Sequence, residues 1–150
     1  MKKALYLFFL LFSSLSISQT LSNTIYEYDK LIAQNPNDMS NYYSRGLLKA
    51  SFNDFKGSIN DFNMVIANNP KDINALYGRA LSRAGINNNS GAITDLSQIV
   101  KYDPNNADAF FKRSFLNAVE GNKSQACSDA RKASSLGLID AESLVDMLCN

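Results

Sequence analysis

The sequence contains no histidine, and this absence restricts the chemistry that the chain could carry out. Histidine is the commonest general base and metal ligand at neutral pH, and catalytic cysteines are usually activated by one. Glycine-rich phosphate-binding loops and clusters of metal-ligating residues are also missing from the sequence. The isolated Asp and Glu side chains that remain are normally solvated at a protein surface. We therefore expect no enzymatic activity, no catalytic residue, no metal site and no cofactor.

An excess of positive charge is missing too. The chain has 15 Lys and Arg residues and 14 Asp and Glu residues, which gives a formal net charge of +1. Nucleic acids and membrane surfaces are bound through clustered positive charge, so neither is expected as a partner. Runs of alternating apolar and polar residues, which would indicate strands, are absent from the sequence as well.

Long apolar runs are missing except at the N-terminus. Two lysines there precede an apolar run over residues 4–12, and small residues follow it. This order is typical of a secretory signal peptide. A membrane anchor is the alternative, but the apolar run is well short of the roughly 20 residues that span a bilayer. We predict a signal peptide over residues 1–18, cleaved between Ser18 and Gln19, and a secreted or periplasmic mature chain over 19–150 that is not embedded in a membrane.

Proline is scarce, but its three occurrences are evenly placed: Pro36, Pro70 and Pro104 are 34 residues apart. A constant interval of this size indicates a solenoid of repeated units. Residues that occupy the same place in successive units are called a column below. Two columns hold residues that favour the N-cap of a helix: Asp38, Asp72 and Asn106, and then Asp54, Asn88 and Asn122. The residue before each second cap tolerates left-handed backbone angles: Asn53, Asn87 and Gly121. Each unit is therefore predicted to contain two helices joined by a tight turn.

The interior columns predict how the two helices of a unit pack. Each helix has one column of small residues: Gly46, Ala80 and Ser114, and then Ser58, Ala92 and Ala126. Apolar residues recur with helical spacing on the second helices: Ile59, Phe62 and Ile66, and then Ile93, Leu96 and Val100. We therefore expect antiparallel helices that approach closely and bury one face each.

The chain resembles the tetratricopeptide repeat (TPR), a helix-turn-helix unit of 34 residues. The first unit carries this pattern in Tyr42-Tyr43-Ser44-Arg45-Gly46, then Phe55, Ser58-Ile59, Asp61-Phe62 and Pro70. The second unit matches it at Leu76, Tyr77, Arg79, Ala80, Ala92, Ile93, Asp95 and Pro104, and the third at Phe110, Phe111, Arg113, Ala126, Asp129 and Ala133. Two positions depart from the pattern, since Leu138 replaces a proline and Lys49 replaces an aromatic residue or leucine.

The resemblance implies an all-α fold, a right-handed antiparallel helix-hairpin solenoid of about three TPR units within residues 19–150. The units are expected at about 39–72, 73–106 and 107–138. A half unit at 20–36 is expected before them, and a capping helix at 140–149, beginning at the cap residue Asp140, is expected after them to shield the exposed core.

The family lines a concave groove with the first helix of each unit, and this implies a binding surface here. The columns that correspond to it hold three aromatic residues beside three further apolar residues: Tyr43, Tyr77 and Phe111, and Leu47, Leu81 and Phe115. An apolar row left on a surface usually marks a partner site, and such a groove fits an extended peptide or an amphipathic helix. The alternative is that the row packs on itself or on a neighbouring subunit.

Cys127 and Cys149 are the only two cysteines. In an exported chain such a pair suggests a disulfide, here one that would join the capping helix to the last hairpin. Two buried free thiols are the alternative. A redox role is less favoured because the two cysteines do not form a Cys-x-x-Cys sequence.

Arginines and aspartates also form columns, the arginines in the first helices and the aspartates in the second: Arg45, Arg79 and Arg113, and Asp61, Asp95 and Asp129. A ladder of ion pairs between helices is one interpretation, and a row of arginines for an acidic partner is the other.

The leading hypothesis is an exported TPR scaffold that binds a protein or peptide partner through this groove. A structural subunit of a cell-envelope assembly, held in a permanent complex, is the alternative, and an enzyme of unfamiliar type is a third. The sequence does not indicate an oligomeric state.

Overall fold

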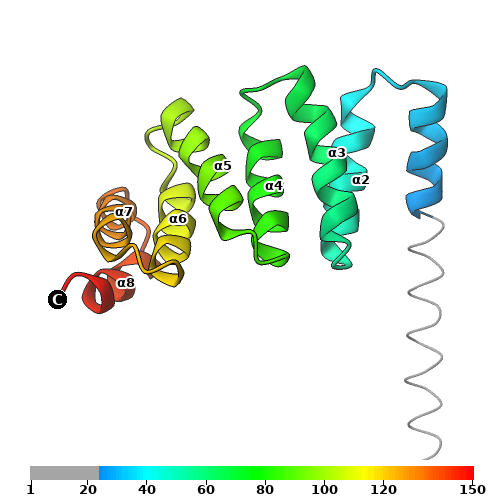
Figure 1. The fold of residues 1–150 in the computed structure, drawn as a ribbon. Coiled ribbons are helices and arrows are strands. Elements are labelled where there is room, and N and C mark those ends of the chain that lie inside the picture. The colour runs from blue at the N-terminus through cyan, green and yellow to red at the C-terminus, as the bar shows by residue number, and fades with distance from the viewer. Residues whose placement is uncertain (1–23) are drawn as a thin grey trace, which may run out of the picture.

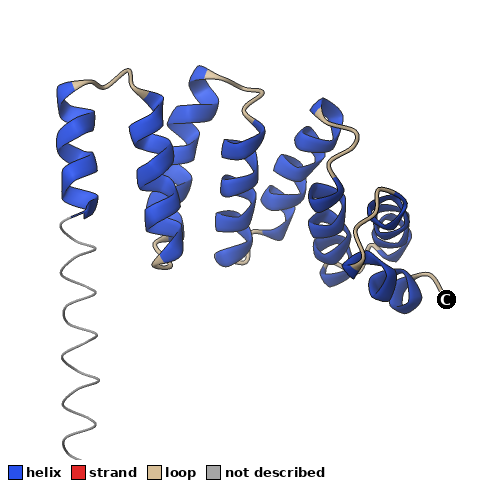
Figure 2. Ribbon diagram, turned by 180° about the vertical axis from the view of Figure 1, so that it is seen from behind, coloured by secondary structure: helices blue, strands red, loops and turns tan. Residues whose placement is uncertain are grey.

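The computed structural model describes residues 24–150, and these form a row of helices connected by short loops, without strands in that range (Figures 1 and 2). The predicted signal peptide and its cleavage site lie outside the described residues. The all-α helical-hairpin solenoid predicted from the sequence is confirmed. Within the described range, no helix combines the length and hydropathy needed to cross a membrane.

The described helices alternate with short loops along the chain. A helix over residues 24–34 precedes the first unit. The labelled helices are α2 (Met39–Ser51), α3 (Phe55–Asn68), α4 (Ile73–Gly85), α5 (Asn89–Tyr102), α6 (Ala107–Val119), α7 (Lys123–Ser135) and α8 (Asp140–Leu148). Each of α2, α4 and α6 forms a hairpin with the helix after it, and each hairpin packs on the next. The helix α8 packs on α7 and touches α6 at one end of the row (Figure 1).

Five of the seven predicted N-caps form as the sequence indicates. A side-chain oxygen of the cap residue accepts a hydrogen bond from a backbone N–H of the first turn at these five positions: Asp38, Asp54, Asp72, Asn88 and Asn106. The prediction was wrong for Asn122, whose Nδ2 donates to Asn117 Oδ1 at 3.3 Å instead. It was also wrong for Asp140, which lies within α8, so that Ile139 precedes the helix and gives no side-chain cap.

The tight turns within the hairpins use left-handed backbone angles, as predicted. Asn53 has a φ of 64°, Asn87 of 60° and Gly121 of 81°. Glycine, which has no side chain, and asparagine, which has a short polar one, adopt these backbone angles at low cost. This geometry reverses the chain and places each second helix against the first.

The buried side chains of the second helices become smaller toward the C-terminal end of the stack. The second helix of the first unit buries Phe62 and Val65, and that of the second unit buries Leu96 and Ile99. The same two columns hold Ala130 and Ala133 in α7. Because alanine buries little apolar area, hydrophobic contact contributes less to the packing of α7 than to that of α3 or α5.

Each unit also carries an arginine that joins three helices. The Arg79 guanidinium donates to both carboxylate oxygens of Asp95, from Nε at 3.0 Å and from Nη2 at 2.7 Å, and its Nη1 donates to Asn63 Oδ1 at 2.7 Å. Both partners lie 16 residues from Arg79, one on α3 and one on α5. The other units repeat the arrangement as Asp29–Arg45–Asp61 and Ser97–Arg113–Asp129. The structure therefore favours the ladder of ion pairs over a row of arginines free for an acidic partner.

The buried aspartates of this ladder accept from a second donor that differs between units. Arg83 Nη1 lies 2.8 Å from Asp95, and Lys49 Nζ lies 2.9 Å from Asp61. This accounts for Lys49, which departs from the family pattern. The third unit has Asn117 in the same column, and Gln125 Nε2 donates to Asp129 at 3.0 Å instead. Asn117 is 4% exposed, and its Nδ2 has no hydrogen-bond partner in residues 24–150.

Gly78 allows α4 to approach the buried ring of Phe62. A Cβ atom at position 78 would overlap the ring of Phe62, lying 2.7 Å from its Cε2 atom, and Phe62 is 0% exposed. Overpacking of this kind costs about 1–3 kcal/mol, whereas the better helix propensity of alanine contributes only about 1 kcal/mol. We expect Gly78→Ala to lower the free energy of unfolding by about 1–2 kcal/mol, measured by denaturant unfolding.

A double-mutant cycle with Phe62→Leu assigns this cost to the ring. Once the ring is removed, Gly78→Ala should be neutral or stabilising, so the two changes together should cost less than their sum. Additive effects would show that contact with Phe62 is not the reason for the glycine.

Candidate functional site

The first helices of the three hairpins each expose an apolar side chain at the same place. Leu47 on α2 is 45% exposed, Leu81 on α4 is 44% exposed and Phe115 on α6 is 55% exposed. Val119, one turn further along α6, is 59% exposed. The same helices bury their opposite faces through residues such as Leu76. Leu47, Leu81, Phe115 and Val119 are called the apolar row below.

The three aromatic residues predicted beside this row are partly buried. The rings of Tyr43 and Phe62 meet edge to face with centroids 5.8 Å apart. Tyr77 packs against the core cluster that contains Leu76 and Leu96. A residue four positions before another on a helix is rotated from it by about 40°, which turns these rings from the row toward the interior of the stack. Tyr43, Tyr77 and Phe111 therefore form a half-buried floor beside the apolar row.

One acidic side chain lies close to this floor. Burial raises the pKa of Tyr77, and the negative charge of Asp108 on α6 raises it further. The side chain of Asp108 takes part in none of the hydrogen bonds or ion pairs found within residues 24–150. Lys112, one turn later on α6, has its ammonium 5.9 Å from the centre of the Phe111 ring. The surface is thus apolar along the row and carries an unpaired carboxylate next to it.

Two further exposed apolar side chains were not predicted from the sequence. Phe52 is 44% exposed and Ile86 is 39% exposed, at the ends of α2 and α4. Their 34-residue spacing was visible in the sequence. This spacing did not predict an apolar column, because the third member of the column, Glu120, is charged.

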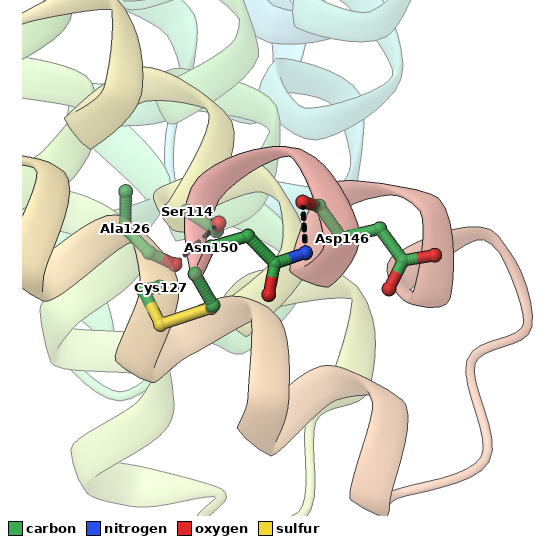
Figure 3. The surroundings of a disulfide bond; sticks show 6 residues. Ser114, Ala126, Cys127, Asp146 and Asn150 are labelled. Carbon is green, nitrogen blue, oxygen red and sulfur yellow. Dashed lines mark hydrogen bonds between the residues drawn. A yellow bond between two sulfur atoms is a disulfide. The ribbon is translucent and has the colours of Figure 1, made fainter.

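The C-terminal end of the stack is held by a covalent bond. Cys127 on α7 and Cys149, which directly follows α8, form a disulfide with an S–S distance of 2.06 Å (Figure 3). Nearby, Ser114 Oγ donates to the carbonyl oxygen of Ala126 at 2.7 Å, which ties α6 to α7. The disulfide thus attaches the capping helix to the last hairpin.

The described residues contain no group of three or more Cys, Asp or Glu side chains placed to hold a metal ion. The three buried aspartates, which would be the strongest candidates for chemistry, are each neutralised by a bidentate arginine. What the arrangement offers is a row of helices in which α2, α4 and α6 each expose an apolar side chain at the same place.

No family model and no curated protein matches the chain. Solved structures share its fold. A crystal structure of MamA superposes with a TM-score of 0.82 at 17% identity, over 89% of this chain and 79% of that one. The type III secretion translocator chaperone SycD of Yersinia enterocolitica gives a TM-score of 0.71 at 14% identity, over 77% and 86%. The first TPR of Spaghetti (RPAP3), bound to the HSP90 peptide SRMEEVD, gives 0.69 at 12% identity, over 74% and 90%. The fold is therefore that of TPR-like helical-hairpin proteins.

Proposed function

We propose that this chain is an exported scaffold that binds an apolar segment of another protein along the apolar row. The observation that carries the proposal is the column of exposed apolar side chains on three successive first helices: Leu47, Leu81 and Phe115. Water-exposed apolar side chains at a constant interval along a stack of helices offer contact area that a partner would bury. The half-buried aromatic floor beside the row packs these helices against the core, with Tyr43 on Phe62 and Tyr77 on the cluster of Leu76 and Leu96.

Two features support export. The N-terminal sequence has the order of a secretory signal peptide. The Cys127–Cys149 disulfide belongs to the class of bond that forms in oxidising compartments. A secreted or periplasmic location agrees with both features.

Introducing a negative charge into the apolar row tests the binding proposal. We expect Leu81→Glu and Phe115→Glu each to weaken capture of the native partner by at least about tenfold, because burial of one large apolar side chain contributes about 1.5–3 kcal/mol. The partner would be captured from the envelope fraction with the oxidised mature chain and then identified. Binding of the purified pair would be measured by titration calorimetry, with thermal unfolding of each variant recorded in parallel.

Met64→Glu is the matched control. Met64 on α3 is 44% exposed, the same fraction as Leu81, but it lies on a second helix outside the row. The control should bind as the unaltered chain does. Equal loss of binding in Met64→Glu and Leu81→Glu, or no loss in Leu81→Glu, contradicts the proposal.

A further inference from the structure

The edge of the binding surface becomes acidic toward the C-terminal end of the stack. One column lies in the first turn of each first helix, and it holds the uncharged Ser40 on α2 and Asn74 on α4. The next two members of this column are Asp108 on α6 and Glu142 on α8. The two helices touch each other in the stack. The 34-residue register therefore gives α6 and α8 a carboxylate at the position that Ser40 and Asn74 occupy on α2 and α4.

These carboxylates differ from the acidic residues that hold the fold together. Asp61, Asp95 and Asp129 are buried and each accepts two hydrogen bonds from an arginine. The side chains of Asp108 and Glu142 are exposed and take part in no hydrogen bond or ion pair within residues 24–150. An acidic residue in the first turn also stabilises a helix, but α2 and α4 form without one in this column. A helix in this place of the repeat therefore forms without a carboxylate in this column.

The position of these carboxylates affects the binding of any partner that covers the apolar row. The charge of Asp108 reaches Tyr77, whose column adjoins that of Leu81, so a partner lying on the row would also lie near this carboxylate. A carboxylate that loses water without gaining a partner disfavours binding, whereas a cation placed against it favours binding and sets orientation. Lys112 is the nearest basic residue on α6, and its ammonium lies over the Phe111 ring. An acidic peptide such as the one bound to the first TPR of Spaghetti would meet like charge here.

We infer that the surface binds a peptide segment that combines apolar side chains with Lys or Arg, the apolar side chains on the apolar row and the cation at Asp108 and Glu142. This inference rests on the proposed function, because it concerns the same surface. It fixes the chemistry of the partner and its direction, with the basic end of the segment toward α6 and α8.

Selection from a phage-displayed random peptide library tests the inference with the oxidised mature chain. Peptides selected by the unaltered chain should be enriched in apolar residues and in Lys and Arg over Asp and Glu. The variant Asp108→Asn/Glu142→Gln should keep the apolar enrichment and lose the basic enrichment. Glu27→Gln is the control and should keep both, because Glu27 is exposed in the helix over residues 24–34, at the other end of the stack.

Affinity of one selected peptide gives the size of the effect. Each neutralised carboxylate should weaken binding by roughly three- to fivefold at low salt, and the effect should shrink as salt screens the charges. A surplus of acidic residues among the selected peptides, no basic enrichment, or an equal effect of Glu27→Gln overturns the inference.

The outcomes also separate this inference from the proposed function. Selected peptides that lose binding to Leu81→Glu but show no basic enrichment keep the apolar row and refute the role of the carboxylates. Selected peptides that bind Leu81→Glu and Phe115→Glu as well as the unaltered chain contradict both. A selection that yields no binding peptide contradicts both as well.

Discussion

Replacement of Asp95 by alanine is expected to lower the free energy of unfolding by about 3–5 kcal/mol, because it leaves two buried or partly buried cations without a counter-charge. Asp95 is 0% exposed and joins Arg79 and Arg83, whose side chains are 13% and 23% exposed. Domains of ordinary stability unfold with about 5–15 kcal/mol, so this loss removes a large part of the total. Urea unfolding followed by circular dichroism measures it.

Glu27→Ala is the matched control for Asp95→Ala. It removes a carboxylate from an exposed position in the helix over residues 24–34, and we expect it to change the free energy of unfolding by less than about 0.5 kcal/mol. A variant with Asp95→Ala that fails to fold would agree with the expected loss, and Asp95→Asn then gives a measurable, smaller effect because it retains a hydrogen-bond acceptor for arginine. Stability of Asp95→Ala within about 0.5 kcal/mol of the control would refute the structural role of the ladder.

Removal of the disulfide is expected to lower the free energy of unfolding by about 3 kcal/mol, the chain-entropy value for a loop of this length. The two cysteines are separated by 22 residues. The column that holds Phe62 in α3 and Leu96 in α5 holds only Ala130 in α7, so few apolar contacts compensate for the loss. The change Cys127→Ala/Cys149→Ala, measured by denaturant unfolding, tests this expectation.

The effect of this change should be concentrated at one end of the stack. In a solenoid each unit contacts only its neighbours, so amide hydrogen exchange should quicken in α8 and α7 while α3 and α4 stay protected. A reducing agent should destabilise the unaltered chain by a similar amount and leave the double variant unchanged. Uniform acceleration of exchange along the chain, or no loss of stability, would show that the bond is not what holds the capping helix.

The hairpins could be predicted because their determinants are local. Asp54 and Asn88 cap the second helices, and Asn53 and Asn87 adopt the left-handed angles of the turns, through contacts within a few residues. The caps predicted at Asn122 and Asp140 fail for two different reasons. In the first case the side chain of Asn122 donates across the turn to Asn117, five residues earlier, instead of capping its own helix. In the second case α8 begins at Asp140 itself, and Ile139 offers no side-chain acceptor.

The sequence by itself determined the number of units, the type of every element and the columns that face one another, because a 34-residue period fixes which residues recur in the same environment. Only the tertiary structure decided which members of the surface columns stay in contact with water. The exposure of Leu81 and the partial burial of Tyr77 depend on the packing of α4 against its neighbours, and that packing is not encoded in spacing alone. Spacing alone does not distinguish Asp108 from Asp95 either, since both are acidic residues in a periodic sequence. Proximity to an arginine in three dimensions makes one of them part of the fold and leaves the other free.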